Sequence, residues 1–221
     1  MPTLSQDAPR AKPQRDRSVF INCPFDEAYK PLLRAGCFTI LACGFAPRCA
    51  LDLSDSGAIR LDQIVKMIAD CDYSIHDVSR VELDAESNLP RFNMPLELGA
   101  DLGLRLRGPK IQRRRKTLVL DAEKHRYDVM LSDISGMDIE SHGSSEQELV
   151  LRVRDWLNIN QRGGNRVLPG AVAILSDYDA FGKIAPDILG PLRLDRLDQL
   201  HHVDYLHVVE LALPQIEAAR S

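Results

Sequence analysis

The chain has 221 residues, of which 44% are apolar and 27% charged, and its formal net charge is −4. This composition is typical of a folded globular protein, and the length suits one domain with an appendage. The negative charge argues against a dedicated nucleic-acid-binding protein, because no global positive field can displace counterions from phosphates. We see no apolar run near the ~20 residues that span a bilayer, and no signal-peptide pattern.

The cysteines are an odd set without a CxxC pair: Cys23, Cys37, Cys43, Cys49 and Cys71. In a chain without a secretion signal, such cysteines are expected to be reduced and mostly buried. We therefore expect a cytoplasmic protein that does not bind membranes.

Apolar patterns predict strands that alternate with helices. Residues 1–17 carry little that could anchor a core and are expected to be a disordered lead-in. The expected strands are 18–23, 45–51, 73–78, 117–121 and 137–141, and the expected helices are 27–43, 58–69, 93–106 and 145–158. Asp26 is expected to cap the first helix, Gly44 to end it, and Asp55 or Ser56 to cap the second.

This alternation is typical of βαβ units. We expect a flavodoxin-like three-layer αβα domain with five parallel strands over residues 18–160. Residues 161–221 should form a helical extension packed on it, with helices near 171–188 and 194–213. In the helix at 93–106, Met94, Leu98, Leu102 and Leu106 should form one face, and Gly99 and Gly103 should let the helix lie close to the sheet.

Three segments with polar groups should meet at the carboxyl edge of the sheet, where open parallel sheets bind ligands. They are residues 22–26, 76–79 and 91–97. The candidate catalytic residues are Glu97 and Asp77. The candidate substrate-binding residues are Asn22, Pro24, Phe25, Ser79, Arg91 and Asn93.

Glu97 is the strongest candidate, because the first turns of a helix favour an ionised carboxylate. Such a group can stabilise an oxocarbenium ion or attack it; a glutamate that merely complements the helix dipole is the alternative. Asp77 can accept hydrogen bonds from sugar hydroxyls or begin an Asx-turn. Alternation along the strand sends His76 to the opposite side from Asp77, so we expect a structural histidine.

The segments VFINCPFDEAY, YSIHDVS and NMPLELGADLG resemble the superfamily of nucleoside 2-deoxyribosyltransferases and TIR-type NAD-cleaving domains. Cys23–Pro24–Phe25 is similar to the family's Gly–Pro–Phe-like turn, and Asp77 to its ribose-binding acid. Glu97–Leu98–Gly99 is similar to its catalytic motif. Arg91–Phe92–Asn93–Met94–Pro95 departs from the Asp-x-Gly-Thr-like segment of deoxyribosyltransferases.

The resemblance implies N-glycosidic cleavage of a nucleotide or nucleoside, with NAD favoured as substrate rather than cofactor. Phe25 would line the base or ribose side, Asn93 would position the leaving side, and Glu97 would stabilise the glycosyl cation. A role in bacterial antiphage defence, gated by homo-oligomeric assembly, follows by analogy. The alternatives are a non-catalytic nucleotide-binding or signalling module and a nucleoside deoxyribosyltransferase.

Other signals are weaker. The loop at 53–57 lacks the spacing of a dinucleotide or P-loop motif, and the basic run at 113–116 lacks interleaved aromatics, so nucleic acid is an unlikely partner. His201, His202, Asp204 and His207 do not converge on a helix, and we expect no metal site.

Overall fold

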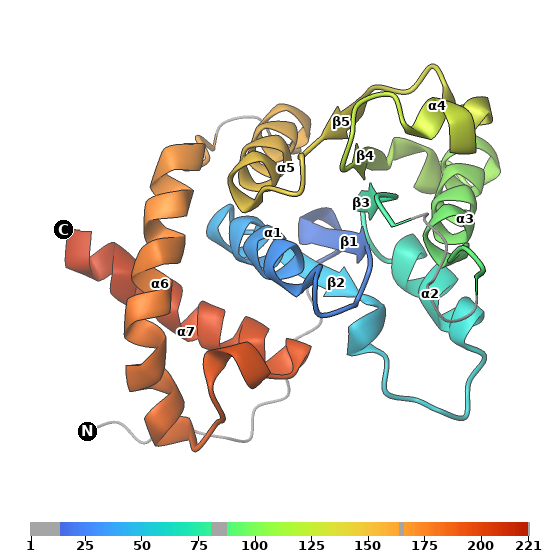
Figure 1. Cartoon of the computed structure of the whole chain (residues 1–221). Coiled ribbons are helices and arrows are strands. Elements are labelled where there is room, and N and C mark those ends of the chain that lie inside the picture. The colour runs from blue at the N-terminus through green and yellow to red at the C-terminus, as the bar shows by residue number, and fades with distance from the viewer. Residues whose placement is uncertain (1–13, 81–87, 164–165, 221) are drawn as a thin grey trace.

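Five parallel strands form one sheet at the centre of the molecule (Figure 1). The computed structural model describes residues 14–80, 88–163 and 166–220. The strands are β1 (Ser18–Asn22), β2 (Ala46–Cys49), β3 (Tyr73–Asp77), β4 (Lys116–Asp121) and β5 (Ile139–Ser141). Their order, β2-β1-β3-β4-β5, is that of flavodoxin-like folds. The predicted fold class is therefore confirmed. Of the lead-in expected at 1–17, residues 1–13 lie outside the described residues, whereas Arg15–Arg17 form a 3-10 turn in which Arg15 pairs with Asp72.

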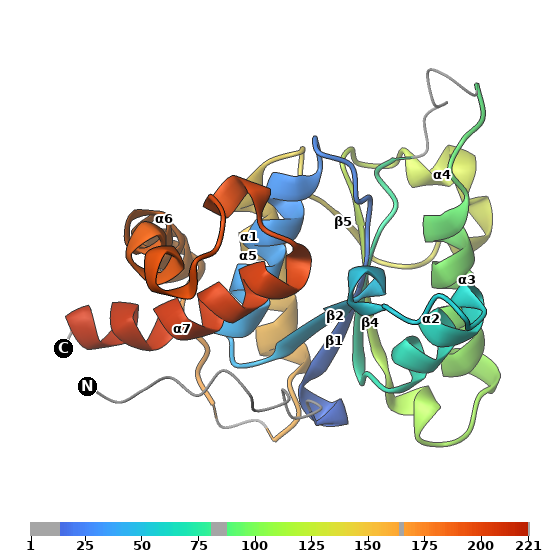
Figure 2. The ribbon, with the colours of Figure 1, turned by 90° about the horizontal axis from the view of Figure 1, so that it is seen from below.

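Helices cover both faces of this sheet (Figures 1 and 2). They are α1 (Lys30–Ala42), α2 (Arg60–Ala69), α3 (Asn93–Arg107), α4 (Tyr127–Met130), α5 (Glu146–Asn160), α6 (Ala171–Leu192) and α7 (His202–Arg220). The 3-10 turns are η1 (Arg15–Arg17), η2 (Ala50–Asp52), η3 (Gln112–Arg114), η4 (Ser132–Ile134) and η5 (Leu197–Gln199). Helices α1 and α5 cover one face, α2 and α3 the other, and α6 and α7 lie outside α1. Within the described ranges, no helix has both the length and the apolarity to cross a membrane.

Both ends of α1 follow from local sequence. The Asp26 Oδ1 atom accepts a hydrogen bond of 2.9 Å from the Tyr29 N–H, which confirms its capping role. Residues 27–29 form a turn, so the helix begins at Lys30 and Pro31 falls in its first turn, where its missing N–H costs nothing. Gly44 ends the helix with a left-handed φ of 76°, as predicted.

Three expectations about the other helices are wrong. The side chain of Asp55 accepts a hydrogen bond from the Gly57 N–H inside the loop, and α2 begins after Ile59 without a side-chain cap. In α3, Gly99 and Gly103 are exposed, and a Cβ atom at either would meet nothing within 4 Å. These two glycines therefore do not bring α3 closer to the sheet. Leu106, expected on the buried face, is 68% exposed.

The C-terminal extension packs on the sheet domain, as expected, and the structure places it on the outside of α1. Phe38 of α1 contacts Tyr178 and Phe181 of α6, and Tyr205 of α7 meets the Phe181 ring edge-on. These residues belong to the same buried cluster as β1 and α5, so the extension shares the core of the sheet domain. The helix expected from residue 194 begins only at His202, because Arg193 ends α6 in a left-handed conformation and residues 194–201 form a 3-10 turn with flanking loop.

A fully buried ion pair joins α3 to the sheet. The Arg115 Nε atom donates to the Asp101 Oδ1 atom at 2.6 Å, and both side chains are 0% exposed. The Asp101 Oδ2 atom accepts from Ser74 at 2.5 Å, from Thr117 at 3.0 Å and from His76 at 3.2 Å. Burial by itself raises the pKa of the Asp101 carboxyl. Hydrogen bonds from His76 and Ser74, together with the positive charge of Arg115, nevertheless hold that pKa well below its ordinary value.

Replacing Asp101 with Asn should lower the free energy of unfolding by about 3 to 5 kcal/mol, because the guanidinium of Arg115 would remain buried without its counter-charge. Equilibrium urea unfolding measures this loss. Asp62→Asn, on the exposed surface of α2, is the matched control and should change stability by no more than about 0.5 kcal/mol. Equal stability of the two variants would contradict a structural role for the pair.

Candidate functional site

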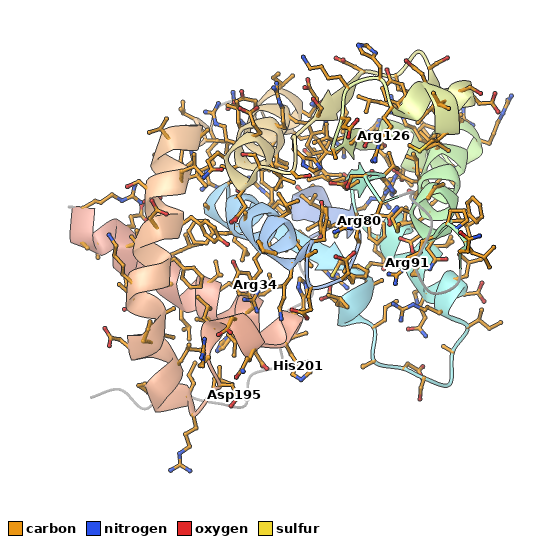
Figure 3. The ribbon with its side chains drawn as sticks, in the orientation of Figure 1. Arg34, Arg80, Arg91, Arg126, Asp195 and His201 are labelled. Carbon is orange, nitrogen blue, oxygen red and sulfur yellow. The ribbon has the colours of Figure 1, made fainter. Side chains whose placement is uncertain are left out.

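The carboxyl ends of the strands face the viewer in Figures 1 and 3. Asn22 pairs in register with His76, and Asp77 with Leu120, so β1, β3 and β4 end at the same level. Because α1 and α3 leave on opposite faces, the gap between β1 and β3 is the topological switch point of the sheet. Ligands of open α/β sheets bind at such points, so this edge is the candidate site.

Asp77 lies on the α1 side of the sheet and is already occupied by protein donors. Its carboxylate accepts hydrogen bonds from the Tyr29 hydroxyl, from His142 Nε2 at 2.9 Å and from the Ser79 N–H at 2.8 Å. Only 1% of the side chain is exposed. In this structure Asp77 therefore holds the loops around the edge together rather than offering its oxygens to a sugar.

His142 acts as a donor in this arrangement. Its Nδ1 atom accepts a hydrogen bond of 3.0 Å from the Ser144 N–H, which places the proton of the neutral ring on Nε2, facing Asp77. Ser144 adopts a left-handed φ of 57°, an uncommon conformation for a serine. The β5–α5 loop is thereby fixed to the end of β3.

His76 and Asn22 lie on the α3 side. The Asn22 amide donates to the Met94 carbonyl at 2.8 Å and to the His76 Nδ1 atom at 3.0 Å, while His76 Nε2 faces Asp101. Both residues are buried, so they fix the start of α3 against β1 and β3. The prediction that His76 is structural and lies opposite Asp77 is confirmed.

Glu97 is placed on α3 just beyond these contacts. It is half-buried, and burial raises the pKa of its carboxyl to about 7, although the positive charge of Arg60 acts in the other direction. Burial raises the pKa of the Cys23 thiol well above its usual value, and the negative charges of Asp77 and Glu97 raise it further. Cys23 thus lies within electrostatic range of both acids, Asp77 toward α1 and Glu97 toward α3.

A polar cavity of about 480 Å³ opens at this edge, on the α1 side, and we call it the edge cavity. Its charged and hydroxyl lining comes from three segments: Ser79, Arg80, Glu123, Arg126, Ser144 and Glu146. Arg80, three residues past the end of β3, and Arg126, five residues past the end of β4, both line this cavity; both are labelled in Figure 3. Arg126 Nη2 donates to Asp121 Oδ1 and to the Ser79 carbonyl at 2.5 Å each, and Arg80 pairs with Asp26 at 3.3 Å.

A second cavity, of about 340 Å³, separates the β1–α1 loop from the C-terminal extension, and we call it the side cavity. Its lining includes Phe25, Arg34 and His201, and Phe25 is 39% exposed. The predicted aromatic therefore faces the extension. We expected Phe25, Asp77 and Glu97 to face one hollow. Phe25 instead lines the side cavity, and Asp77 is buried and hydrogen-bonded to Tyr29, His142 and Ser79.

The remaining predicted residues are spread along the edge. Pro24 is buried, and Ser79 is buried but lines the edge cavity. Arg91 and Asn93 are exposed at the start of α3, and Figure 3 places Arg91 toward α2 and α3, away from Arg126.

Sequence reasoning missed Arg80, Arg126, Tyr29 and His142. Arg126 follows the end of β4 by five residues, so the rule that selected residues after β1 and β3 would also have found it if applied to β4. Tyr29 and His142 gave no such signal, because each reaches Asp77 from a different loop.

Comparisons with protein-family models, with curated proteins and with solved structures found no match for this chain. The fold and the geometry of the edge therefore carry the functional argument.

The Glu97 carboxyl should titrate with a midpoint near pH 7, which ¹³C NMR of the labelled carboxyl can measure. The pKa of Glu97 is higher in the folded state than its value of 4.5 in the unfolded state. Between about pH 4.5 and pH 7 the folded state therefore binds more protons than the unfolded state, so the free energy of unfolding falls as the pH rises through this range. Glu97→Gln should remove this loss, so its stability relative to the unaltered protein should rise across that window.

Glu27→Gln is the matched control, because the Glu27 side chain is 88% exposed. It should leave the pH dependence of stability between those values unchanged. A titration midpoint of Glu97 near pH 4.5 would show that its carboxyl is fully solvated, and would contradict the prediction that burial raises its pKa.

Proposed function

We propose that this protein binds a nucleotide at the carboxyl edge of its sheet and cleaves the N-glycosidic bond, with NAD as the favoured substrate. The observation that carries the proposal is Glu97, a half-buried carboxyl with a pKa near 7 beside the β1–β3 switch point. Acids with such perturbed pKa values are typical of catalytic sites.

The edge cavity supports the nucleotide part of the proposal. Arg80 and Arg126 bring two guanidinium groups to its lining, and these also pair with Asp26 and Asp121. Ser79 and Ser144 add hydroxyls, and Glu123 and Glu146 add carboxylates. The N-termini of α1 and α5 also border the edge cavity, through Tyr29 and Glu146. Guanidinium groups and helix N-termini both favour phosphate oxygens. A dinucleotide would keep its phosphates in this cavity and extend across the switch point toward Glu97.

Cleavage of NAD needs little acid assistance, because the departing nicotinamide carries the positive charge. As the C1′–N bond breaks, its electron pair neutralises the ring nitrogen, and the ribosyl group becomes an oxocarbenium ion. Glu97 in its ionised form would stabilise that cation until water adds to C1′ and releases a proton. Asp77, occupied by Tyr29 and His142, would position the surrounding loops without touching the substrate.

Glu97→Gln should lower the rate of nicotinamide release from NAD at least about 100-fold while NAD still binds, because the amide cannot neutralise the developing cation. Chromatography of the products gives the rate, and isothermal titration calorimetry gives the affinity. The rate for the unaltered protein should rise with pH through about 7, as Glu97 ionises.

Glu27→Gln is again the control and should retain the full rate, since Glu27 is exposed and lies away from α3. Unchanged nicotinamide release by Glu97→Gln would remove Glu97 from the mechanism. No release by the unaltered protein, with NAD bound, would favour the non-catalytic alternative.

Arg80→Met should weaken nucleotide binding by about tenfold to about 100-fold, because it removes a charge-assisted contact to phosphate. Arg80 is exposed, so the substitution leaves the core intact. Arg196→Met, at the residue just before η5 of the extension, is the matched control and should bind as the unaltered protein does. Equal losses in the two variants would show a non-specific effect of net charge.

The second candidate is a non-catalytic nucleotide-binding or signalling module. It is favoured by the position of the edge cavity on the α1 side, whereas Glu97 lies on α3. A nucleoside deoxyribosyltransferase is a third candidate, which exchange of a second free base into the nucleoside would reveal.

We further propose a cytoplasmic location, because all five cysteines are unpaired and buried. A role in antiphage defence with activity gated by homo-oligomeric assembly stays a proposal by analogy.

A further inference from the structure

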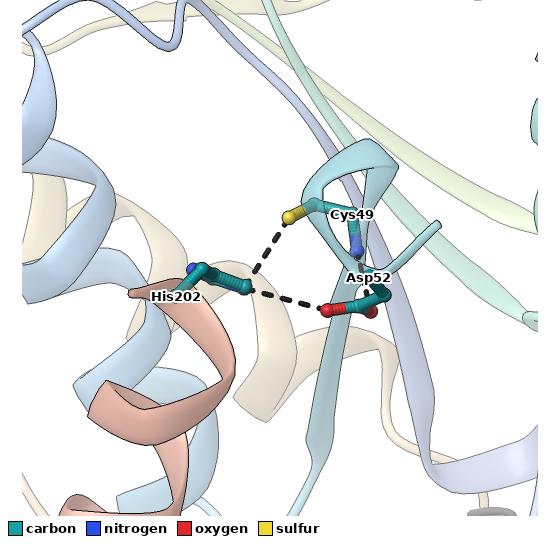
Figure 4. A group of neighbouring side chains, drawn as sticks. All are labelled: Cys49, Asp52 and His202. Carbon is teal, nitrogen blue, oxygen red and sulfur yellow. Dashed lines mark hydrogen bonds and ion pairs between the residues drawn. The ribbon is translucent and has the colours of Figure 1, made fainter. Parts of the chain in front are cut away.

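Three potential metal ligands meet where the C-terminal extension touches the sheet domain (Figure 4). Cys49 ends β2, Asp52 ends the following turn η2, and His202 begins α7. Their ligand atoms all lie within 4.8 Å of one another. The cluster is separate from the edge cavity and from Glu97, and it borders the side cavity through His202.

Two of the three distances between ligand atoms are close to the edges of a tetrahedron around a small divalent cation. The Cys49 Sγ atom is 3.3 Å from His202 Nε2, and the Asp52 Oδ1 atom is 3.7 Å from the same nitrogen. With Zn–S near 2.3 Å and Zn–N and Zn–O near 2.0 to 2.1 Å, tetrahedral coordination places sulfur about 3.5 Å and oxygen about 3.3 Å from the nitrogen. The Cys49 sulfur and the Asp52 carboxylate oxygen lie within 4.8 Å of each other. This third edge should be about 3.5 Å in the tetrahedron, so the two side chains approach each other when the ion binds.

The two residues from η2 are held in place by their own turn. The Asp52 Oδ2 atom accepts from the Cys49 N–H at 3.1 Å and from Arg48 Nε at 3.3 Å, which leaves Oδ1 directed toward His202. The Cys49 side chain in turn accepts from the Asp52 N–H. Such supporting contacts orient metal ligands in known sites.

A catalytic Cys–His–Asp triad does not fit this geometry. In a triad the acid contacts the ring nitrogen that faces away from the nucleophile. Here Figure 4 shows Cys49 and Asp52 approaching the same atom, His202 Nε2. The Cys49 side chain is also buried, so no substrate could reach its sulfur. An electron-rich sulfur and a carboxylate oxygen around one imidazole nitrogen instead surround a position suited to a cation.

We propose that Cys49, Asp52 and His202 bind one zinc ion, with water from the side cavity as the fourth ligand. Thiolate, imidazole and carboxylate are all zinc ligands, and three protein ligands with one open position are typical of sites that retain exchangeable water. The ion cross-links α7 to the end of β2, across 153 residues of sequence, and so fixes the extension to the sheet domain.

The test uses Co²⁺ and Zn²⁺ with the full-length protein, first dialysed against a chelator. One equivalent of Co²⁺ should produce a thiolate-to-metal charge-transfer band in the near ultraviolet, and Zn²⁺ should remove the band by displacement. Cys49→Ser should abolish the band, and His202→Ala should weaken Zn²⁺ binding by more than about 100-fold, beyond the loss typical of a supporting contact.

His201→Ala is the matched control, because His201 is the neighbouring histidine and also lines the side cavity but is not one of the three ligands. It should keep the band and the affinity. Asp52→Asn preserves the oxygen that caps the turn and should weaken binding while retaining the fold, which circular dichroism verifies. The proposal is overturned if the unaltered protein gives no charge-transfer band, if the band survives in Cys49→Ser, or if His202→Ala binds Zn²⁺ as tightly as the unaltered protein does.

Discussion

The buried pair between Asp101 and Arg115 determines where the candidate site lies. An arginine inside a core is costly unless its charge is neutralised and its hydrogen bonds are made. Asp101 neutralises Arg115, whose Nη1 atom donates to the carbonyls of Ile68 and Cys71, while its buried Nη2 atom has no hydrogen-bond partner among the described residues. The acid comes from α3 and the arginine from the residue before β4, so the pair sets the position of α3 against the sheet.

From this pair a chain of hydrogen bonds leads to the carboxyl edge. Asp101 faces His76, His76 accepts from Asn22, and Asn22 donates to the carbonyl of Met94 in the first turn of α3. Glu97 is three residues further along that helix. Its half-buried position, and the raised pKa that follows, therefore depend on a polar network that makes no contact with a ligand itself.

The alternation of side chains along β3 divides the edge into two sides. His76 and Asp77 are adjacent in sequence, yet one faces Asp101 on α3 and the other faces Tyr29 and His142. The arginine-lined edge cavity belongs to the Asp77 side, and Glu97 to the His76 side. A ligand that uses both must cross the switch point between β1 and β3. A long ligand such as a dinucleotide meets this requirement more readily than a nucleoside does.

The sequence by itself determined the fold class, because the period of its apolar residues and its turn residues are local properties. All five strands and the cores of the α1, α2, α3 and α5 helices could be predicted in this way, as could the opposite orientations of His76 and Asp77. The tertiary structure alone decided which polar residues meet. Arg115 belongs to a basic run that the sequence presents as surface, yet the fold buries it against Asp101, 14 residues away. His142 reaches Asp77 across 65 residues, and His202 reaches Cys49 across 153, and no local pattern encodes such distances. Contacts of this kind depend on how helices and loops pack, which is fixed only when the whole core has formed.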